Sequence, residues 1–257
     1  MIDLKQAEKI FLEETNQYDL QNENIKRKQL HSLRVMENAK AIAERLGLSK
    51  EQVAVSTLIG LLHDIGRFEQ YTRYQTYSDQ NSVDHGELGV SLLKENNRIR
   101  KYITEEQYDE IIFKAIQNHG KYQIQEGLSE EELLYAKLIR DADKLDILYE
   151  GCDIFWKNDI EAINESILSK EILEQIKKQE TVLRKKGRSF QKIDSVVELM
   201  ALVYDLNYKE SFAILKEADY INQITNRFEL QDQQSKEDFE WVRREINQYI
   251  QEKLEKK

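Results

Sequence analysis

The chain has 257 residues with nine glycines and no proline, and its 40% hydrophobic and 33% charged residues favour a mostly helical protein. The net charge of −10 without a basic stripe excludes duplex nucleic acid as a partner, and the lack of a long apolar run or a signal-peptide core excludes a membrane partner. The single cysteine, Cys152, excludes an intrachain disulfide and a cysteine-based zinc cage, so we expect a cytoplasmic protein.

Apolar residues recur at helical spacing through the first 150 residues. The helices that this spacing predicts cover residues 3–20, 24–46, 49–65, 84–94, 104–119 and 129–149. Gly47 and Gly66 are expected to end the second and third of these helices in the left-handed conformation. Between residues 67 and 83, aromatic and charged residues alternate without a clear period, which predicts a short helix followed by a loop.

Polar residues at several predicted helix starts indicate N-caps. Ser49 and Thr104 each precede a glutamine by three residues, which is the spacing of a capping box. Ser82 or Asp84 would cap the helix that begins near residue 84, and Ser129 would cap the helix that follows a polar loop.

The rest of the chain is also predicted to be helical, since no segment has the alternation of a strand. The predicted helices cover residues 159–168, 170–186, 192–206 and 208–218, and a long polar helix begins near Ser235. Residues 187–189 are the best candidate for a mobile loop. No clear domain boundary is present, so we predict an all-α fold in which residues 1–257 form a single-domain helical bundle.

The pair His63-Asp64 stands at the end of a largely apolar run, Val53–Leu62. A buried imidazole and a buried carboxylate each need a partner, and a metal ion can serve both. The other three histidines fall on core-facing helix positions or beside helix ends, at His31, His85 and His119. Asp143 shares a predicted helix face with apolar residues, so these side chains together form a candidate ligand set.

Imidazole and carboxylate ligands together suit Mn, Fe, Zn, Co or Ni better than Ca, with Mg as a further option. Six such ligands exceed the needs of one open metal site. They fit two ions about 3.5–4 Å apart that share a carboxylate, an arrangement used for phosphoester chemistry. The alternative for His85 and His119 is a phosphate-binding or helix-capping role beside a single ion.

The sequence resembles the HD-domain superfamily of metal-dependent phosphohydrolases. The resemblance rests on His31, on LLHDIGR around His63 and on RDADKLD around Asp143. SVDHGELG around His85 and IQNHGKY around His119 resemble the longer, two-metal variant of the motif. The resemblance implies an HD-type metal-binding core over residues 24–150, with residues 151–257 as a helical extension packed on it.

The resemblance also implies the roles of the ligands. One metal would be bound by the residues of the shorter motif, which are His31, His63, Asp64 and Asp143. The two further histidines would bind a second metal, with Asp64 bridging both, and a water between the ions would become the nucleophile. Nearby cations would hold the substrate phosphate, and the candidates are Arg67, Arg73, Arg140 and Lys144. Arg67 and Lys144 are also expected to act in catalysis with Asp64.

The implied function is hydrolysis of a phosphomonoester or phosphodiester in a nucleotide or a small phosphorylated metabolite. Two alternatives stay open: a mixed-valence di-iron oxygenase of the same superfamily, and a non-catalytic metal-binding sensor module. The chain lacks the Gly-Tyr-Pro signature of the superfamily's cyclic-di-GMP phosphodiesterases, since it has no proline. The segment from Arg67 to Tyr77 is either part of the substrate site or a solvated loop, and Asp84 either caps its helix or orients His85.

Overall fold

The structure is a computed structural model that describes residues 2–182 and 190–256. Within these ranges it contains helices and no strand, which confirms the predicted all-α class. The chain divides into two compact units, Met1–Asp143 and Lys144–Lys257, and the boundary falls inside one long helix. The predicted single domain, with a C-terminal extension packed on a core over residues 24–150, stays a prediction.

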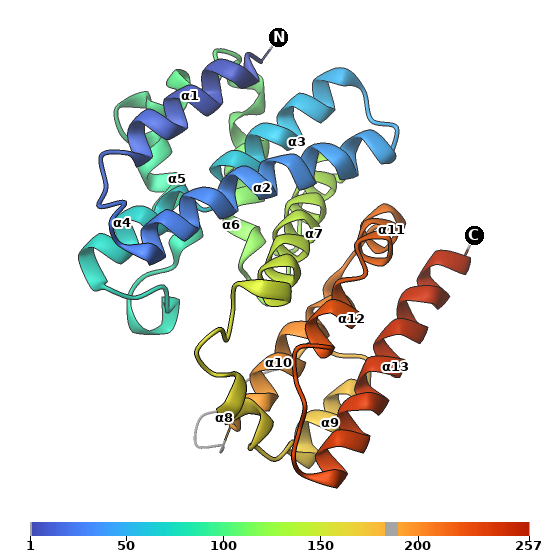
Figure 1. The fold of residues 1–257 in the computed structure, drawn as a ribbon. Coiled ribbons are helices and arrows are strands. Elements are labelled where there is room, and N and C mark those ends of the chain that lie inside the picture. The colour runs from blue at the N-terminus through green and yellow to red at the C-terminus, as the bar shows by residue number, and fades with distance from the viewer. Residues whose placement is uncertain (1, 183–189, 257) are drawn as a thin grey trace. The chain divides into compact units, whose positions relative to one another are not determined.

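The first unit is built from helices joined by short 3-10 turns (Figure 1). Its helices are α1 (Leu4–Thr15), α2 (Glu23–Arg45), α3 (Lys50–Leu62), α4 (Ile65–Tyr74), α5 (His85–Lys94), α6 (Asp109–His119) and the first part of α7 (Glu130–Asp153). The 3-10 turns are η1 (Asp79–Asn81), η2 (Glu95–Lys101) and η3 (Glu106–Tyr108). The helices predicted over residues 24–46 and 84–94 match α2 and α5 to within one residue at each end.

Helices α2 and α3 lie side by side (Figure 1). The capping box at Ser49 that starts α3 is confirmed, because Ser49 and Gln52 exchange backbone-to-side-chain hydrogen bonds of 3.0 and 3.2 Å. A β-carbon at Gly60 would lie 2.8 Å from the Cα of Met36 and 2.9 Å from the carbonyl oxygen of Val35. This close approach presses the turn of α3 that precedes His63 against the helix that carries His31.

The prediction that Gly66 ends a helix in the left-handed conformation is wrong. Helix α3 already ends at Leu62, and Gly66 is the second residue of α4. Its missing side chain serves packing, since a β-carbon at Gly66 would clash with the carbonyl oxygen of His85 and lie 2.6 Å from the backbone nitrogen of Gly89. The glycine therefore lets α5 approach the start of α4 closely.

The capping box predicted at Thr104 is also wrong. The Thr104 hydroxyl donates to the carboxylate of Glu105 at 2.9 Å, and the chain first forms the turn η3 before α6 begins at Asp109. The start of α7 is as predicted, because the backbone nitrogen of Glu132 donates to Ser129 Oγ at 3.2 Å. The Glu132 carboxylate accepts from the Ser129 backbone at 2.7 Å, which completes a capping box.

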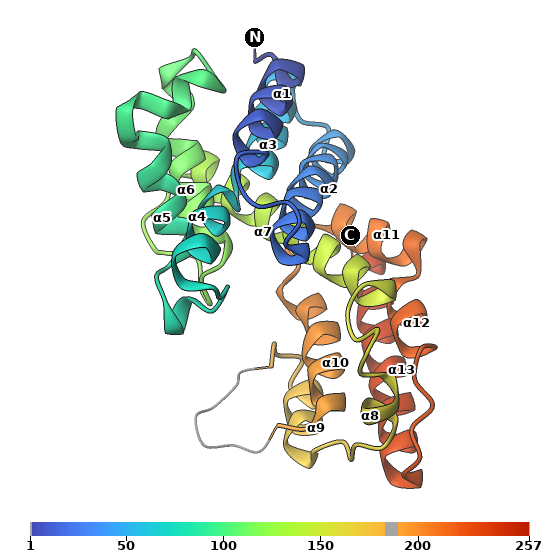
Figure 2. The same ribbon diagram turned by 60° about the vertical axis from the view of Figure 1, so that its left-hand side comes forward.

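In its described residues, the second unit contains the end of α7 and six further α-helices. These are α8 (Ile160–Asn164), α9 (Lys170–Lys177), α10 (Lys192–Met200), α11 (Lys209–Ala218), α12 (Tyr220–Thr225) and α13 (Gln233–Glu255), with the 3-10 turn η4 (Ala201–Asp205) directly after α10. Helix α13 runs beside α12 (Figure 2). The six-residue α12 was not predicted, because one and a half turns give too little periodicity to recognise.

The helix predicted over residues 170–186 is shorter in the structure. It ends at Lys177, and Gln179 follows in the left-handed region with a φ of 56°. Residues 183–186 of that prediction, and the loop predicted at 187–189, lie outside the described residues. Among the helices that the structure describes, none combines the length and the apolar character that crossing a bilayer requires.

Candidate metal centre

The six predicted ligands all belong to the first unit and come together there. His31 lies on α2, His63 and Asp64 join α3 to α4, His85 begins α5, His119 ends α6, and Asp143 lies on α7. The four histidines and Asp64 are buried, and the side chain of Asp143 is 15% exposed. Four helices and the junction between α3 and α4 thus contribute to one polar cluster inside an apolar core.

One group of possible ligands surrounds one oxygen of Asp64. Asp64 Oδ2 lies 3.5 Å from the Nε2 atoms of both His31 and His63. Asp143 Oδ1 closes this group, at 3.1 Å from His31 Nε2 and 3.7 Å from His63 Nε2. The two imidazole nitrogens lie 3.2 Å apart. His31, His63 and Asp64 therefore converge within the reach of one ion.

The second group surrounds the other oxygen of the same carboxylate. Asp64 Oδ1 lies 3.4 Å from the Nε2 atoms of both His85 and His119. These two nitrogens are 2.9 Å apart. Each oxygen of Asp64 thus faces a different pair of histidines, which is the geometry expected of a carboxylate shared between two groups of ligands.

In three of the four imidazole rings, the nitrogen that faces away from the cluster is held by a hydrogen bond. His63 Nδ1 lies 2.7 Å from the carbonyl oxygen of Gly60, and His119 Nδ1 lies 2.6 Å from that of Ile116. His85 Nδ1 lies 2.7 Å from Asp79 Oδ2. A carbonyl or carboxylate acceptor requires a proton on Nδ1, so Nε2 keeps the lone pair that a metal ligand needs. Burial also lowers the pKa of His85, which keeps its ring neutral at pH 7.

Both central carboxylates are ionised at neutral pH. Burial by itself would raise the pKa of Asp64, but the ammonium group of Lys28 and the neighbouring histidines outweigh it and hold this pKa well below its ordinary value. Burial would likewise raise the pKa of Asp143, and its contacts with His31 and His63 outweigh it and hold this pKa well below its ordinary value. The cluster therefore contains two negatively charged carboxylates.

The donor set fits a metal better than a purely structural role. Asp64 Oδ1 is buried and has no hydrogen-bond partner, although an orphaned buried acceptor is costly. The imidazole nitrogens meet in pairs at hydrogen-bonding distance, an arrangement in which lone pairs oppose each other unless a cation or proton lies between them. Mixed imidazole and carboxylate donors suit a divalent transition metal.

Lys28 belongs to the site and was not found from the sequence. Its ammonium group lies 2.7 Å from Asp64 Oδ2, and its side chain is only 15% exposed. It also lies 5.8 Å from the centre of the Tyr77 ring. The available signal was its position three residues before His31 on the same helix, which places both on one face.

The predicted substrate cations have different surroundings. Arg67 Nε lies 3.5 Å from Asp64 Oδ1, while its Nη1 donates to the carbonyl oxygen of Tyr77 at 2.6 Å. The Arg73 side chain is 51% exposed and pairs with Glu69 at 2.5 Å. Of the four, the structure brings Arg67 to the carboxylate of the cluster, so part of the 67–77 segment does border it. The substrate roles themselves stay predictions.

The other two predicted substrate cations, Arg140 and Lys144, each bind residues of the unit to which they belong. Arg140 is 4% exposed, and its guanidinium donates to the carbonyl oxygens of Asn118 at 2.9 Å and of His119 at 3.3 Å. It therefore caps the end of α6 and helps hold His119 in place. Lys144 lies in the second unit, where its ammonium group pairs with Asp205 at 2.8 Å.

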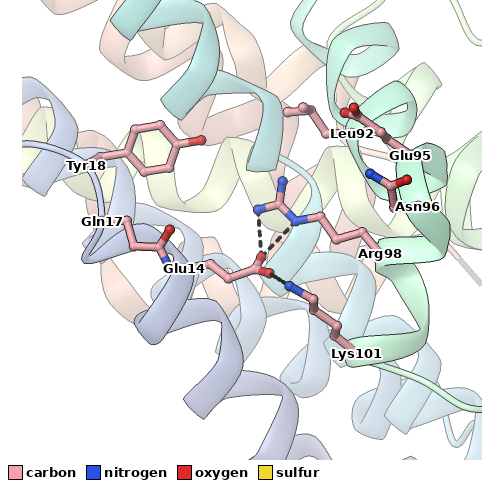
Figure 3. Close-up of a pocket in the computed structure, with 8 residues that line it drawn as sticks. All are labelled: Glu14, Gln17, Tyr18, Leu92, Glu95, Asn96, Arg98 and Lys101. Atoms are coloured by element: carbon pink, nitrogen blue, oxygen red, sulfur yellow. Dashed lines mark hydrogen bonds and ion pairs between the residues drawn. The ribbon is translucent and has the colours of Figure 1, made fainter.

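The first unit contains a second charged cluster, which shares no residue with the histidine cluster. It borders a hollow of about 530 Å³ lined by Glu14, Gln17, Tyr18, Leu92, Glu95, Asn96, Arg98 and Lys101 (Figure 3). The Glu14 carboxylate accepts hydrogen bonds from Arg98 at 2.6 and 2.9 Å and from Lys101 at 2.9 Å (Figure 3). Both oxygens are satisfied by permanent cations, so this cluster ties α1 to η2.

Comparison with known proteins agrees with this geometry. A family model described as the HD domain matches residues 30–148, a range that contains all six residues of the cluster. The chain matches no curated protein and no solved structure. HD domains are typically domains of metal-dependent phosphohydrolases. Residues 30–148 of this chain therefore match the HD domain, the domain of the superfamily that the sequence resembles.

Proposed function

We propose that the protein is a metal-dependent phosphohydrolase with a dinuclear centre. The observation that carries the proposal is the position of Asp64, whose two oxygens face different pairs of imidazole nitrogens at 3.4 and 3.5 Å. One ion would be held by His31, His63, Asp143 and Asp64 Oδ2. The other would be held by His85, His119 and Asp64 Oδ1.

When bound, such ions supply a Lewis acid and a water molecule that ionises near neutral pH. The protein contributes fixed ligand orientation, through acceptors on Nδ1 of His63, His85 and His119. It also contributes burial, which strengthens every electrostatic interaction in the site.

Two cations would bind the phosphoryl oxygens of the substrate. Arg67 Nε is a buried donor without a hydrogen-bond partner, 3.5 Å from Asp64 Oδ1. Lys28 lies beside the other oxygen of the same carboxylate at 2.7 Å. A positive group on each side of Asp64 favours a small phosphorylated metabolite or a nucleotide, because a planar guanidinium and a compact ammonium both bind phosphate oxygens well.

The test is an activity screen with metal-free protein. Phosphomonoesters, phosphodiesters and nucleotides are incubated with Mn²⁺, Co²⁺, Ni²⁺, Fe²⁺ or Mg²⁺ added singly, and released phosphate or product is measured. We expect turnover that requires a metal and that His63→Gln abolishes. Glu95→Gln is the matched control, since Glu95 lines the separate hollow and should leave turnover unchanged.

Three results would change the assignment. Full turnover in the folded His63→Gln protein would contradict a hydrolase that works through this cluster. Substrate binding without turnover under every metal would favour the sensor module. An iron electron-resonance signal with oxygen consumption would favour the di-iron oxygenase of the same superfamily.

A further inference from the structure

The hydrogen bond that orients His85 differs from those that orient two of the other histidines. His63 and His119 each use the carbonyl oxygen of a residue three positions earlier in their own helices. His85 instead uses a carboxylate oxygen, Asp79 Oδ2, at 2.7 Å. Asp79 lies in η1, between α4 and α5, so the acceptor comes from outside the helix that carries the ring.

Asp79 is itself held in place by α4. Its other oxygen, Oδ1, accepts from Gln70 Nε2 at 2.8 Å and from Arg67 Nη1 at 3.0 Å. Gln70 is fully buried, and its amide nitrogen also donates to the carbonyl oxygen of Val83 at 2.9 Å. The amide of Gln70 therefore fixes both the carboxylate and the loop that precedes α5.

Asp79 and Asp84, the two carboxylates that most closely precede His85 in the sequence, have separate tasks. Asp84 accepts from the backbone nitrogen of Glu87 at 2.9 Å, so it caps α5, and the open alternative that it orients His85 is settled in favour of the cap. Both oxygens of Asp79 are occupied by the imidazole, the guanidinium and the amide. Asp79 is thus placed to act on the ring and not as a ligand in its own right.

We propose that Asp79 is a positioning residue that fixes the tautomer and the basicity of His85, and thereby controls occupancy of the metal position formed by His85 and His119. A carboxylate acceptor keeps the proton on Nδ1 and increases electron density on Nε2, which strengthens that nitrogen as a ligand. His31 and His63 lie at the other oxygen of Asp64, so the position that they form with Asp143 should be little affected. This inference rests on the dinuclear centre of the proposed function.

The first experiment titrates Mn²⁺ into metal-free protein and follows binding by calorimetry. Asp79→Asn keeps the shape of the side chain and removes its charge, so we expect one Mn²⁺ to bind about 10–100-fold more weakly and the other to be unchanged. The control is Asp84→Asn, which removes a charge from the same loop and retains a good N-cap. Equal affinities in wild type and Asp79→Asn, whatever the number of ions, would overturn the proposal.

The second experiment reads the ring directly and needs no metal. Nitrogen-15 chemical shifts of labelled histidine in metal-free protein report the tautomer of each ring, and His85→Gln assigns the signals. We expect His85 to carry its proton on Nδ1 in the wild type and in Asp84→Asn, and to populate both tautomers in Asp79→Asn. An unchanged tautomer in Asp79→Asn would count against the positioning role.

Failure of this inference and failure of the proposed function are distinguishable. A protein that hydrolyses phosphoesters with full Mn²⁺ affinity in Asp79→Asn remains a hydrolase without this device. A protein whose Mn²⁺ binding and tautomer respond to Asp79→Asn, but which turns over no phosphoester, supports the inference and contradicts the function.

Discussion

Two of the buried carboxylates in the first unit have opposite surroundings. Glu14 is 9% exposed, and its oxygens accept hydrogen bonds from Arg98 and Lys101. Asp64 is 2% exposed, yet one of its oxygens has no hydrogen bond and lies 3.4 Å from two imidazole nitrogens. Both acids are ionised at neutral pH, since each has a pKa below its ordinary value despite burial, which by itself would raise it.

The difference shows that burial of a charge does not by itself identify a functional site. Arg98 and Lys101 donate hydrogen bonds to both oxygens of Glu14, so this carboxylate holds two elements together. Lys28 pairs with Asp64 Oδ2, but Asp64 Oδ1 has no hydrogen bond and faces imidazole lone pairs, which suits the binding of a further cation. Removing each charge in turn should therefore separate loss of chemistry from loss of stability.

The largest expected effect is on turnover in Asp64→Asn. Losing a group behind a metal ligand typically costs about 10–100-fold, so losing the shared ligand itself should reduce turnover by more than about 100-fold. Metal content by elemental analysis should fall with it in the folded variant. Glu14→Gln should keep most of the turnover under conditions in which it is folded. Similar losses of turnover in Asp64→Asn and Glu14→Gln would contradict the distinction between the two carboxylates.

Gly66→Ala should disturb the metal centre without altering a ligand. The added methyl group would clash with the carbonyl oxygen of His85, so α4 and α5 must separate at a cost of about 1–3 kcal/mol. We expect weaker Mn²⁺ binding in calorimetry together with lower stability. Gly47→Ala strains a left-handed turn with a φ of 69° but meets no atom within 4 Å. Gly47→Ala should lower stability and leave Mn²⁺ affinity unchanged. Equal losses of Mn²⁺ affinity in Gly47→Ala and Gly66→Ala would contradict the packing argument.

Glu14→Gln should act on stability alone. Breaking a fully buried ion pair costs about 3–5 kcal/mol of folding stability. The Arg98 side chain is 22% exposed, so solvent screens this pair and we expect Glu14→Gln to lose about 2–3 kcal/mol. Urea unfolding at pH 7 measures this loss. The control is Glu95→Gln in the same hollow, expected within about 0.5 kcal/mol of the wild type. A Glu14→Gln protein as stable as Glu95→Gln would show that the ion pairs of Glu14 do not stabilise the contact between α1 and η2.

The smallest expected effect is the pH dependence of the stability difference between wild type and Glu14→Gln. Hydrogen bonds from Arg98, Tyr102 and Lys101 overcome burial and hold the pKa of Glu14 below its ordinary value of 4.5. The stability that Glu14 provides is therefore fully present above pH 4.5 and is lost as pH falls through the lower folded-state pKa. The stability gap between wild type and Glu14→Gln should be constant near neutral pH and shrink in acid. A gap that widens in acid would reverse the assigned sign.

Most helices could be predicted because they follow from local rules, and the convergence of the six side chains could be predicted from the motif that the sequence resembles. Helical periodicity placed His31 on a core-facing side of its helix, and motif spacing joined it to His63, Asp64 and Asp143. Capping boxes succeeded at Ser49, where both hydrogen bonds form within one turn. Such signals depend on neighbours a few residues apart, which a sequence displays directly.

The missed features depend on contacts between distant segments. Asp79 orients His85 only because Gln70, nine residues earlier, fixes its carboxylate at 2.8 Å. Lys28 meets Asp64 across 36 residues of chain. Thr104 has the spacing of a cap, yet a 3-10 turn competes for the same segment and prevails. No local pattern encodes these outcomes, because tertiary packing decides among several acceptable local choices.

The tight contact at Gly66 has a consequence for recognising diverged copies of this domain. Motifs for such sites are usually written as ligands alone, but the residue two places after Asp64 is constrained as strictly, because α5 leaves no room there for a β-carbon. A sequence that retains all six ligands but has a bulky residue at this place must space these helices differently. The group that corresponds to His85, His119 and Asp64 would then be reshaped or lost. A glycine at the place of Gly66 is therefore a sequence marker for a complete centre.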